Sequence, residues 1–178
     1  LGRLFGARDF RSAIVFLRTK RRAKRLAQKL EREGRSAVAL QGNMSQAQRT
    51  RALEGFRNGR FTILVATDIA ARGLDISGIS HVINFDLPNT PDAYTHRIGR
   101  TGRSGLMGKA FTFVTPADAD GLRRIERRLG ASIPRRRLED LGLADEKRPG
   151  RVRNRGAQSA SKSQRKRKPT RRRAGTPK

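Results

Sequence analysis

Apolar and polar positions alternate between two patterns along the first 130 residues. Short apolar runs, which are typical of buried strands, occupy residues 12–17, 36–40, 62–66, 81–85 and 109–115. Between these runs apolar residues recur at helical spacing, as in the face made by Ala23, Leu26, Ala27 and Leu30. The spacing and the flanking residues predict helices over residues 20–33, 46–58, 91–98 and 117–129. Strands that alternate with helices predict an α/β fold, with helices covering both faces of a mostly parallel sheet.

Capping and turn residues mark several of the expected ends. Gly34 is well placed to end the first predicted helix, and Ser45 is expected to be the N-cap of the second. Thr67 and Asp68 can cap a short helix over residues 69–72. Three aromatic residues fall on apolar positions and are expected in the core: Phe16, Phe56 and Phe85.

The composition changes sharply after Leu143, where apolar residues nearly vanish. Residues 147–178 contain 14 Lys or Arg and no acid. Such a segment cannot bury enough apolar surface to offset the entropy lost on ordering, so we expect it to be disordered. We therefore divide the chain into a folded domain over 1–130, a connecting segment over 131–146 and a Lys/Arg-rich tail over 147–178.

The net charge points to a polyanionic partner. Lys and Arg total 42 and Asp and Glu total 15, so the formal net charge is +27. Residues 1–146 alone keep 28 basic and 15 acidic groups, an excess of 13. Because both parts of the chain are basic, a nucleic acid is the expected class of partner.

Several other functions are disfavoured by the composition. The chain has no Cys, which excludes a disulfide framework, a thiolate zinc site and a thiol nucleophile. His81 and His96 have no second ligand at metal spacing, so no metal site is predicted. No run approaches the roughly 18 apolar residues of a membrane span, and no signal-peptide pattern is present. We expect a soluble, cytoplasmic protein without membrane contact.

Polar groups follow the predicted strands at their carboxyl ends, which is where ligands bind in open α/β sheets. Along the chain these groups are Arg18, Thr19, Lys20, Gln41, Gly42, Asn43, Gln46, Arg49, Thr67, Asp68, Arg72, Gly73, Asp75, Asp86 and the arginine series Arg97, Arg100 and Arg103. One edge of the sheet is therefore predicted to carry many hydrogen-bonding and cationic groups, with carboxylates within reach of a ribose or a cation. Such an edge could hold phosphates.

Arg97, Arg100 and Arg103 lie three residues apart, with Gly99 and Gly102 between them. On a helix this spacing gathers the guanidinium groups along one side. Like charges so close repel one another, and glycines weaken the helix that would hold them. Neither helix propensity nor core packing explains the arrangement, which favours a ligand outside the segment.

Each of these features also has a plainer interpretation. The arginines can form a solvated basic face, and Asp75 can balance Arg72 in a surface ion pair worth under about 1 kcal/mol. Gln46 and Arg49 can belong to an ordinary exposed helix start. The ordered occurrence of all of them at one sheet edge favours the functional interpretation.

Three quoted segments together resemble a known family. "ATDIAARGLDI", then "VINFDLP", then "YTHRIGRTGR" are similar to the second, C-terminal RecA-like lobe of DEAD-box ATP-dependent RNA helicases. "IVFLRTK" and "LQGNMSQAQR" precede them in the matching order, so that the resemblance covers about residues 10–130. "IPRRRLEDL" resembles the bacterial branch. The resemblance implies a RecA-like three-layer domain.

The resemblance also implies roles for individual residues. Arg100 and Arg103 would reach the γ-phosphate of ATP as arginine fingers, and Asp75 would hydrogen-bond the ribose. Contacts between the two lobes would involve His96, Arg97 and Asp86. The RNA backbone would lie along Thr19, Gln46, Arg49, Thr67 and Gly73. An arginine finger is worth roughly 10³–10⁵ in rate in related nucleotidases.

The chain departs from a complete helicase in ways that matter for catalysis. It has no P-loop of the form GxxxxGK[ST] and no acidic metal-binding tetrapeptide. "GLMGKA" is a decoy, since Ala110 replaces the magnesium-binding Ser or Thr and Arg103 replaces the first Gly. Two further positions differ from residues common in the family: Gln41, where His is common, and Leu106, where a basic residue is common.

We therefore expect a fragment that is inactive alone. The full-length enzyme would hydrolyse ATP with Mg²⁺ bound mainly by the missing N-terminal lobe, and the partners would be RNA, ATP and that lobe. Two alternatives stay open: a stand-alone RNA-binding module without catalysis, and a lobe of a DNA helicase. The tail would tether structured RNA, or it would act as a solubilising or nuclear-addressing run.

Overall fold

The computed structural model describes residues 1–137 apart from positions 3, 7, 74–75, 77 and 103–106. These residues belong to one compact unit, Leu1–Arg137. The tail predicted to be disordered lies outside the described residues, as does the second half of the connecting segment. In the part of the chain that is described, no helix combines the length and apolar character needed to cross a membrane.

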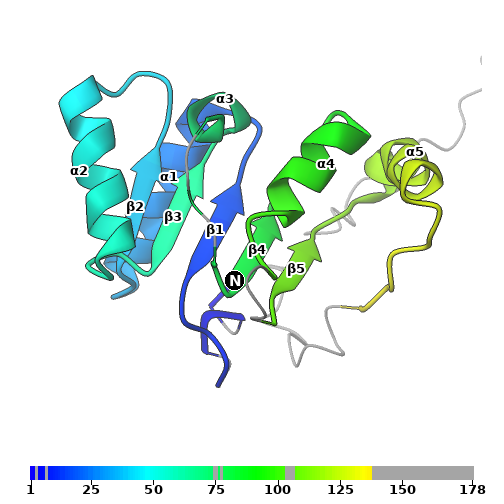
Figure 1. Cartoon of the computed structure of the whole chain (residues 1–178), viewed down its shortest axis with the longest axis horizontal. Helices are drawn as coiled ribbons and strands as arrows, with labels where there is room; N and C mark the ends of the chain where they lie inside the picture. Colours follow the sequence, from blue (N-terminus) through cyan, green and yellow to red (C-terminus); the bar gives the residue numbers. More distant parts are fainter. Residues whose placement is uncertain (3, 7, 74–75, 77, 103–106, 138–178) are drawn as a thin grey trace, which may run out of the picture. The chain divides into compact units, whose positions relative to one another are not determined.

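The five predicted strands are present and pair in parallel. They are β1 (Ala13–Phe16), β2 (Ala37–Leu40), β3 (Ile63–Ala66), β4 (His81–Asn84) and β5 (Lys109–Thr112). Their order across the sheet is β2-β3-β1-β4-β5 (Figure 1). Every strand is shorter than its apolar run by one to three residues, because a strand ends where its neighbour stops pairing rather than where apolar residues stop.

The predicted helices are also present, with small shifts at their ends. They are α1 (Lys20–Arg32), α2 (Gln46–Arg57), α3 (Asp68–Ala71), α4 (Pro91–Ile98) and α5 (Ala119–Leu129). Two short 3₁₀ helices, η1 (Leu4–Gly6) and η2 (Pro116–Asp118), complete the described elements. The start of the last predicted helix is thus η2, a separate 3₁₀ turn that precedes α5.

Side-chain caps explain where three of the helices begin. The hydroxyls of Thr19, Ser45 and Thr90 each accept a hydrogen bond from a backbone amide in the first turn of α1, α2 and α4. Ser45 forms a complete capping box with Gln48, as the predicted N-cap requires. Thr67 stands at the N-cap position of α3, but its side chain makes no capping hydrogen bond. The short helix begins one residue earlier than predicted, at Asp68.

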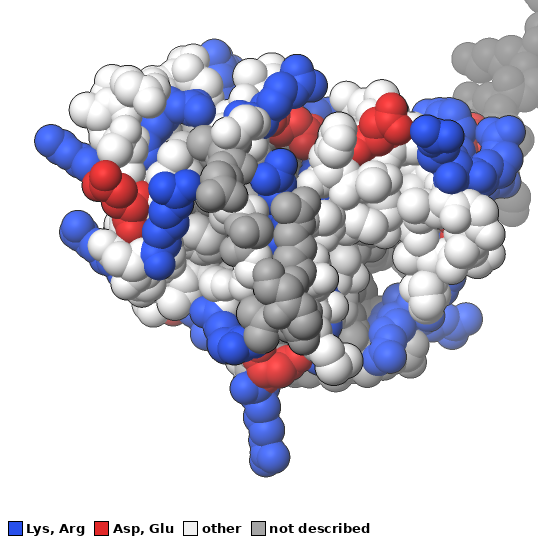
Figure 2. All heavy atoms as spheres, viewed as in Figure 1, with Lys and Arg blue, Asp and Glu red and all other residues white. Residues whose placement is uncertain are grey.

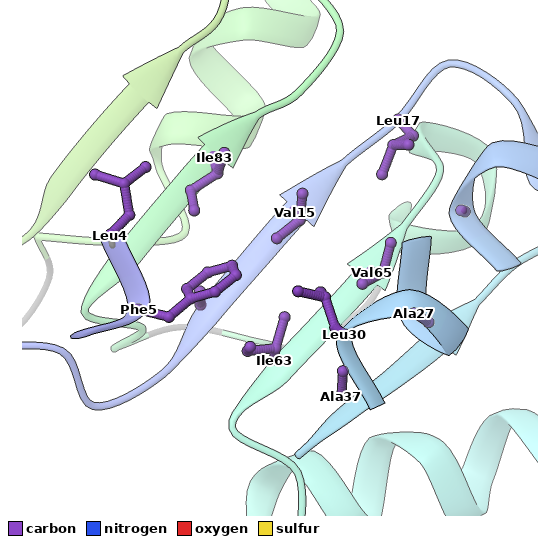
Figure 3. Close-up of a cluster of buried hydrophobic side chains, with 12 residues drawn as sticks. Leu4, Phe5, Val15, Leu17, Ala27, Leu30, Ala37, Ile63, Val65 and Ile83 are labelled. Atoms are coloured by element: carbon purple, nitrogen blue, oxygen red, sulfur yellow. The ribbon is translucent and has the colours of Figure 1, made fainter. Parts of the chain in front are cut away.

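The two faces of the sheet are covered by different helices, as expected. On one face Val15, Ile63 and Val65 pack against Ala27 and Leu30 of α1, with η1 beside them (Figure 3). On the other face the alternate strand residues pack against α2 and α3, in a cluster that includes Ile14, Phe16, Leu64, Ala52 and Phe56. The parallel strands are apolar on both faces because both are covered.

Of the three aromatic residues expected in the core, two are fully buried. Phe16 and Phe56 are 2% and 8% exposed. Phe85 is only partly buried and meets Phe113 edge-on, with ring centroids 5.8 Å apart. It directly follows the last residue of β4, and the Arg22 guanidinium of α1 lies 5.7 Å from the centre of its ring.

The strand order creates a crevice at one place on the carboxyl edge. The connection from β1 leads to β2 at one end of the sheet, whereas the connection from β4 leads to β5 at the other. Since β1 and β4 are neighbours, their carboxyl ends diverge into loops that run in opposite directions. Ligands of open α/β sheets bind at such a switch point.

Candidate functional site

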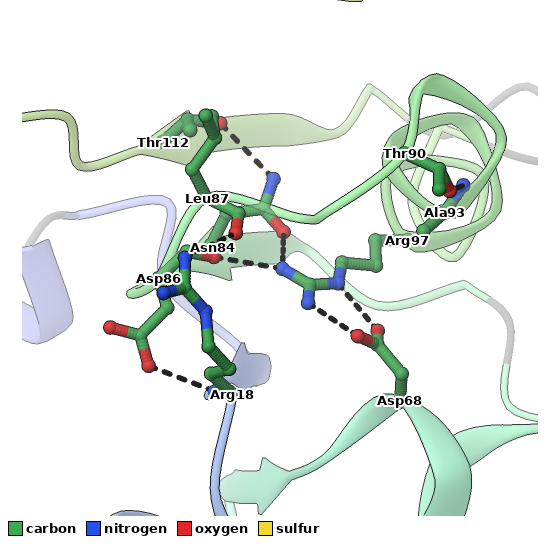
Figure 4. Close-up of polar contacts among 9 residues, drawn as sticks. All are labelled: Arg18, Asp68, Asn84, Asp86, Leu87, Thr90, Ala93, Arg97 and Thr112. Atoms are coloured by element: carbon green, nitrogen blue, oxygen red, sulfur yellow. Dashed lines mark hydrogen bonds and ion pairs between the residues drawn. The ribbon is translucent and has the colours of Figure 1, made fainter. Parts of the chain in front are cut away.

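Arg97 forms the centre of a polar cluster at this switch point. Its side chain, in the last turn of α4, is only 3% exposed. Nε lies 2.6 Å from Oδ1 of Asp68, and Nη2 lies 2.7 Å from Oδ2 of the same carboxylate (Figure 4). Nη1 donates to Oδ1 of Asn84 at 3.1 Å and to the carbonyl of Asp86 at 2.9 Å. The guanidinium also lies 4.9 Å from the centre of the Phe16 ring.

Through these contacts Arg97 links separate elements of the domain, and we call it the Arg97 strut. They connect α4 to the first turn of α3, to the end of β4 and to the loop that follows β4. A bidentate pair with a carboxylate is among the stronger polar interactions, and a charge this deeply buried must be paired. The predicted interlobe contact of Arg97 stays a prediction, and it would have to use the small exposed part of the side chain.

Asp86 links the loop that follows β4 to the loop that follows β1 and to α1. Its Oδ2 accepts a hydrogen bond from the backbone amide of Arg18 at 2.8 Å. Its Oδ1 lies 2.6 Å from Nη1 of Arg22, in the first turn of α1. The Arg18 side chain in turn donates to the carbonyl of Leu87 at 3.5 Å, so the two loops are linked in both directions (Figure 4). The carboxylate of Asp86, predicted at the lobe interface, thus has a structural task within the lobe.

A cleft with a volume of about 490 Å³ lies beside this cluster. Its lining comes from the end of β1, from α3 and the residues after it, and from α4 and the turn that leaves α4: Phe16, Asp68, Ala71, Arg72, Gly73, Ala93, His96, Arg97 and Arg100. The cleft therefore gathers four of the predicted site residues, Gly73, His96, Arg97 and Arg100. Asp75 and Arg103, predicted to contact ATP, lie outside the described residues.

The two described arginines of the series have different environments. Helix α4 ends at Ile98 with Gly99 as its C-cap, so Arg97 is helical whereas Arg100 is in the turn that follows. Both line the cleft, but Arg97 is buried whereas Arg100 is partly exposed. The Arg100 amide donates to the Arg97 carbonyl at 3.2 Å, which couples the position of Arg100 to that of the buried strut. The helix therefore ends between two arginines that have different surroundings.

The residues predicted to contact RNA are brought to the same edge. Thr19 and Gln46 stand at the exposed starts of α1 and α2. Arg49 donates from Nη2 to the carbonyl of Ala70 at 3.2 Å and so ties α2 to α3. Thr67 is 8% exposed. Gly73 has a φ of +74°, a conformation that favours glycine.

Sequence reasoning missed the partners that hold these residues in place. It places Arg18 and Asp68 at this edge, with a capping role for Asp68, but pairs neither with a partner, and it gives no role to Asn84. The buried, cationic Arg97 on an otherwise amphipathic helix is a signal that an acidic partner must lie nearby. That signal identifies the need for a partner but not which of the carboxylates at this edge supplies it.

His81 lies at the opposite, amino end of β4 and is a core histidine. Its Nδ1 is 2.9 Å from the hydroxyl of Ser80, and its ring stacks on Phe111 with centroids 6.1 Å apart. Burial lowers the pKa of His81 below its ordinary value, against the opposing effect of Asp9. Among the described residues, no group of three or more potential metal ligands is present.

Comparison with known proteins agrees with this geometry. Residues 1–105 match the family model described as Helicase conserved C-terminal domain. The chain is 48% identical over 146 residues to the DEAD-box ATP-dependent RNA helicase CshA of Bacillus licheniformis, a match that covers 82% of this chain and 30% of that relative. The chain thus spans about a third of the length of this relative.

Two solved structures are similar in fold. The E. coli DEAD-box protein SrmB, solved with the regulator of ribonuclease activity A, has a TM-score of 0.73 and 40% identity, covering 78% of this chain and 81% of that chain. S. cerevisiae Dbp5 bound to RNA and ADP BeF3 has a TM-score of 0.66 and 37% identity, covering 74% and 37%. The expected RecA-like fold and the resemblance to DEAD-box C-terminal lobes are confirmed. Since its family model matches more than half of the residues, the chain belongs to the helicase conserved C-terminal domain family.

Proposed function

We propose that the chain works as the C-terminal lobe of an ATP-dependent RNA helicase and supplies Arg100 and Arg103 to ATP held mainly by the N-terminal lobe. The observation that carries the proposal is the cleft at the carboxyl edge, which Arg100 lines together with His96 and Gly73. A cytoplasmic location belongs to the same proposal.

The lobe's contribution to ATP hydrolysis is electrostatic. Negative charge on the phosphoryl oxygens must be stabilised as the terminal phosphate is transferred, and planar guanidinium donors suit this task better than a lysine does. The Arg97 strut holds the end of α4, and the turn that follows presents Arg100 to the cleft. Mg²⁺, bound mainly by the other lobe, would neutralise phosphate charge from the opposite side.

RNA would run along the same edge of the sheet. Thr19, Gln46, Arg49, Thr67 and Gly73 lie at or beside the carboxyl ends of β1, β2 and β3. Exposed amides and hydroxyls at helix starts are suited to phosphate oxygens. The similarity to Dbp5, whose structure holds RNA and ADP BeF3, supports this assignment. Binding of ATP and RNA would close the two lobes, and the closed lobes would bend one strand and separate a short duplex.

The test combines this chain with the N-terminal lobe of its parent protein and measures ATP hydrolysis with and without RNA. RNA-stimulated turnover is expected from the mixture and not from either lobe alone. Arg103→Ala should lower that turnover by about 10³-fold or more, by the usual worth of an arginine finger. Arg25→Ala, an exposed change on α1, is the matched control. Unchanged turnover with Arg103→Ala would refute the arginine-finger role.

The high positive charge favours a second candidate, an RNA-binding module without catalysis. Such a module would bind RNA by counterion release, with no dependence on ATP or on a second lobe. RNA binding that does not change when the N-terminal lobe and ATP are added would support it. Competition of RNA against DNA in the ATPase assay distinguishes the RNA helicase lobe and the RNA-binding module from the lobe of a DNA helicase.

A further inference from the structure

The outer side of α5 and the segment after it carry a dense group of arginines that the proposed cleft does not use. We call this group the α5 arginine surface; its members are Arg123, Arg124, Arg127, Arg128, Arg135 and Arg136. All six side chains belong to exposed residues. Figure 2 shows Lys and Arg gathered over α5 at the right of the view.

The folding of α5 does not require these arginines. The helix buries Leu122 and Ile125 in a small cluster with Leu87 and Tyr94. Helical geometry then places Arg123 above Arg127 and Arg124 above Arg128, with a rise of about 6 Å within each pair. Like charges four residues apart disfavour a helix, and this repulsion opposes the favourable effect of Arg127 and Arg128 in its last turn.

Acidic groups neutralise only part of the surface. Arg123 pairs with Asp120, and Arg135 pairs with Glu126 at 2.6 Å. Arg128 lies 3.9 Å from a carboxylate oxygen of Asp92. Within the described ranges, Arg124 and Arg127 have no acidic side chain within 4.0 Å. The two line a shallow hollow of about 560 Å³ together with Asp120, Arg123 and Glu126.

We propose that the α5 arginine surface binds the phosphate backbone of RNA outside the cleft. The inference rests on the proposed function only in taking RNA as the ligand. Guanidinium forks match phosphate oxygens, and a rise of about 6 Å within each pair suits successive phosphates of one strand. A protein partner would need apolar or aromatic anchors, but the one large exposed apolar residue on α5 is Leu129, at its end. The contact is to phosphates and is therefore independent of sequence.

The first test measures the salt dependence of RNA binding by the full chain, without the other lobe and without ATP. Fluorescence anisotropy of a labelled RNA gives Kd at a series of salt concentrations. Arg124→Gln/Arg127→Gln should reduce the slope of log K against log salt by about 0.7 for each single-strand phosphate that the variant no longer neutralises. Arg25→Gln/Arg32→Gln removes the same charge from α1, on the other side of the sheet, and should leave the slope nearly unchanged. Equal slopes for the two double variants would overturn the proposal.

The second test locates the RNA directly. Because the chain has no Cys, Ser132→Cys next to α5 and Gln28→Cys on α1 each provide a single attachment point for a photo-crosslinker. Crosslinking to RNA is expected to be several-fold stronger from position 132 than from position 28, and equal or weaker crosslinking contradicts the inference. Polyglutamate that displaces the labelled RNA more effectively than unlabelled RNA of the same total charge would favour an acidic protein surface as the ligand and would also overturn the proposal.

The two proposals can fail separately. With the N-terminal lobe present, Arg124→Gln/Arg127→Gln should raise the RNA concentration needed for half-maximal ATP hydrolysis and leave turnover at saturating RNA unchanged. A loss of saturated turnover would contradict a binding surface outside the cleft. The Arg103→Ala variant can lose RNA-stimulated hydrolysis while the α5 variant keeps an unaltered salt slope. That result would support the helicase role and contradict the proposed RNA-binding surface on α5.

Discussion

Arg97 and Asp68 form a bidentate ion pair, with Nε–Oδ1 and Nη2–Oδ2 distances of 2.6 and 2.7 Å, that joins the end of α4 to the start of α3. The two helices border the cleft from different sides, and each contributes residues to its lining. Because Arg97 is 3% exposed, the pair acts as a rigid link whose loss would change the shape of the cleft.

Removal of Arg97 should destabilise the lobe strongly. Arg97→Ala leaves the buried Asn84 amide oxygen and the Asp86 carbonyl without their donor, and an unsatisfied buried acceptor costs about 1–3 kcal/mol. Asp68 also loses its partner, but it is 42% exposed and can be solvated. Urea unfolding followed by circular dichroism measures the change. Arg25→Ala, on the exposed side of α1, should change the free energy of unfolding by less than about 0.5 kcal/mol. Equal stabilities of the two variants would contradict the strut role.

Arg100 should behave in the opposite way. Arg100→Gln is expected to lower RNA-stimulated ATP hydrolysis by the lobe mixture by about 10³-fold. It should cost less stability than Arg97→Ala, since Arg97 is buried and Arg100 is partly exposed in a turn. Turnover measured at saturating ATP and RNA, beside urea unfolding of each variant, separates the two effects. A normal turnover in Arg100→Gln would argue against its assignment to the γ-phosphate.

Gly73 should tolerate substitution by alanine less well than does a glycine whose φ is not positive. Its φ is +74°, whereas a Cβ added there would meet nothing within 4 Å, so the cost of Gly73→Ala is conformational. We expect a loss of about 1 kcal/mol, from the strain of a left-handed conformation. Gly42→Ala is the matched control because it also has open space and no positive φ. Thermal unfolding of the two variants checks the difference.

The segment after α5 should detach in acid. The side-chain hydrogen bond from Arg135, with a further one from the Ile133 amide, lowers the pKa of Glu126 to about 2 from the ordinary value of 4.5. Because the folded pKa is below the unfolded one, the stabilisation is fully present above about pH 4.5 and is lost as the pH falls through about 2.

The Ile133 amide reports this titration directly, since it donates to Oε1 of Glu126 at 2.8 Å. Its NMR chemical shift should move with a midpoint near pH 2, and this movement should be absent in Glu126→Gln. A midpoint at the ordinary pKa of a glutamate would show that the segment is not held in solution as it is in the structure.

Local patterns in the chain account for much of the fold. The apolar runs predicted all five strands, and Ser45 as the expected N-cap predicted the start of α2 to the residue. These features depend on residues within one turn or one strand, where sequence spacing and spatial spacing are the same. The ends of strands and the start of α5 were less accurate because they depend on pairing and packing with distant elements.

The order of residues along the chain also predicts which residues lie at the carboxyl edge of the sheet. Parallel strands bring their carboxyl ends to one edge, so residues that follow strands collect there whatever the strand order. Of the residues expected at this edge on that ground, Arg72, Gly73 and Arg100 line the cleft, and so do Asp68 and Arg97. His96 also lines the cleft, but only the family resemblance indicated it. Asp75 and Arg103 are expected at the same edge for the same reason. The contacts assigned to them remain predictions.

Residue order alone left open which arginine of the series would be buried and which would stay partly exposed. The partners of Arg97 are 29 and 13 residues away in sequence, and the amide that binds Asp86 is 68 residues away. The spacing of apolar residues predicts which side of a helix is buried. It does not predict the partner of a buried guanidinium, because any carboxylate that the strand order brings near can pair with it. The folded arrangement of β1, β4, α3 and α4 determines which residues pair with Arg97. The physical reason is that a desolvated charge is stable only beside a partner that packing places within hydrogen-bonding distance.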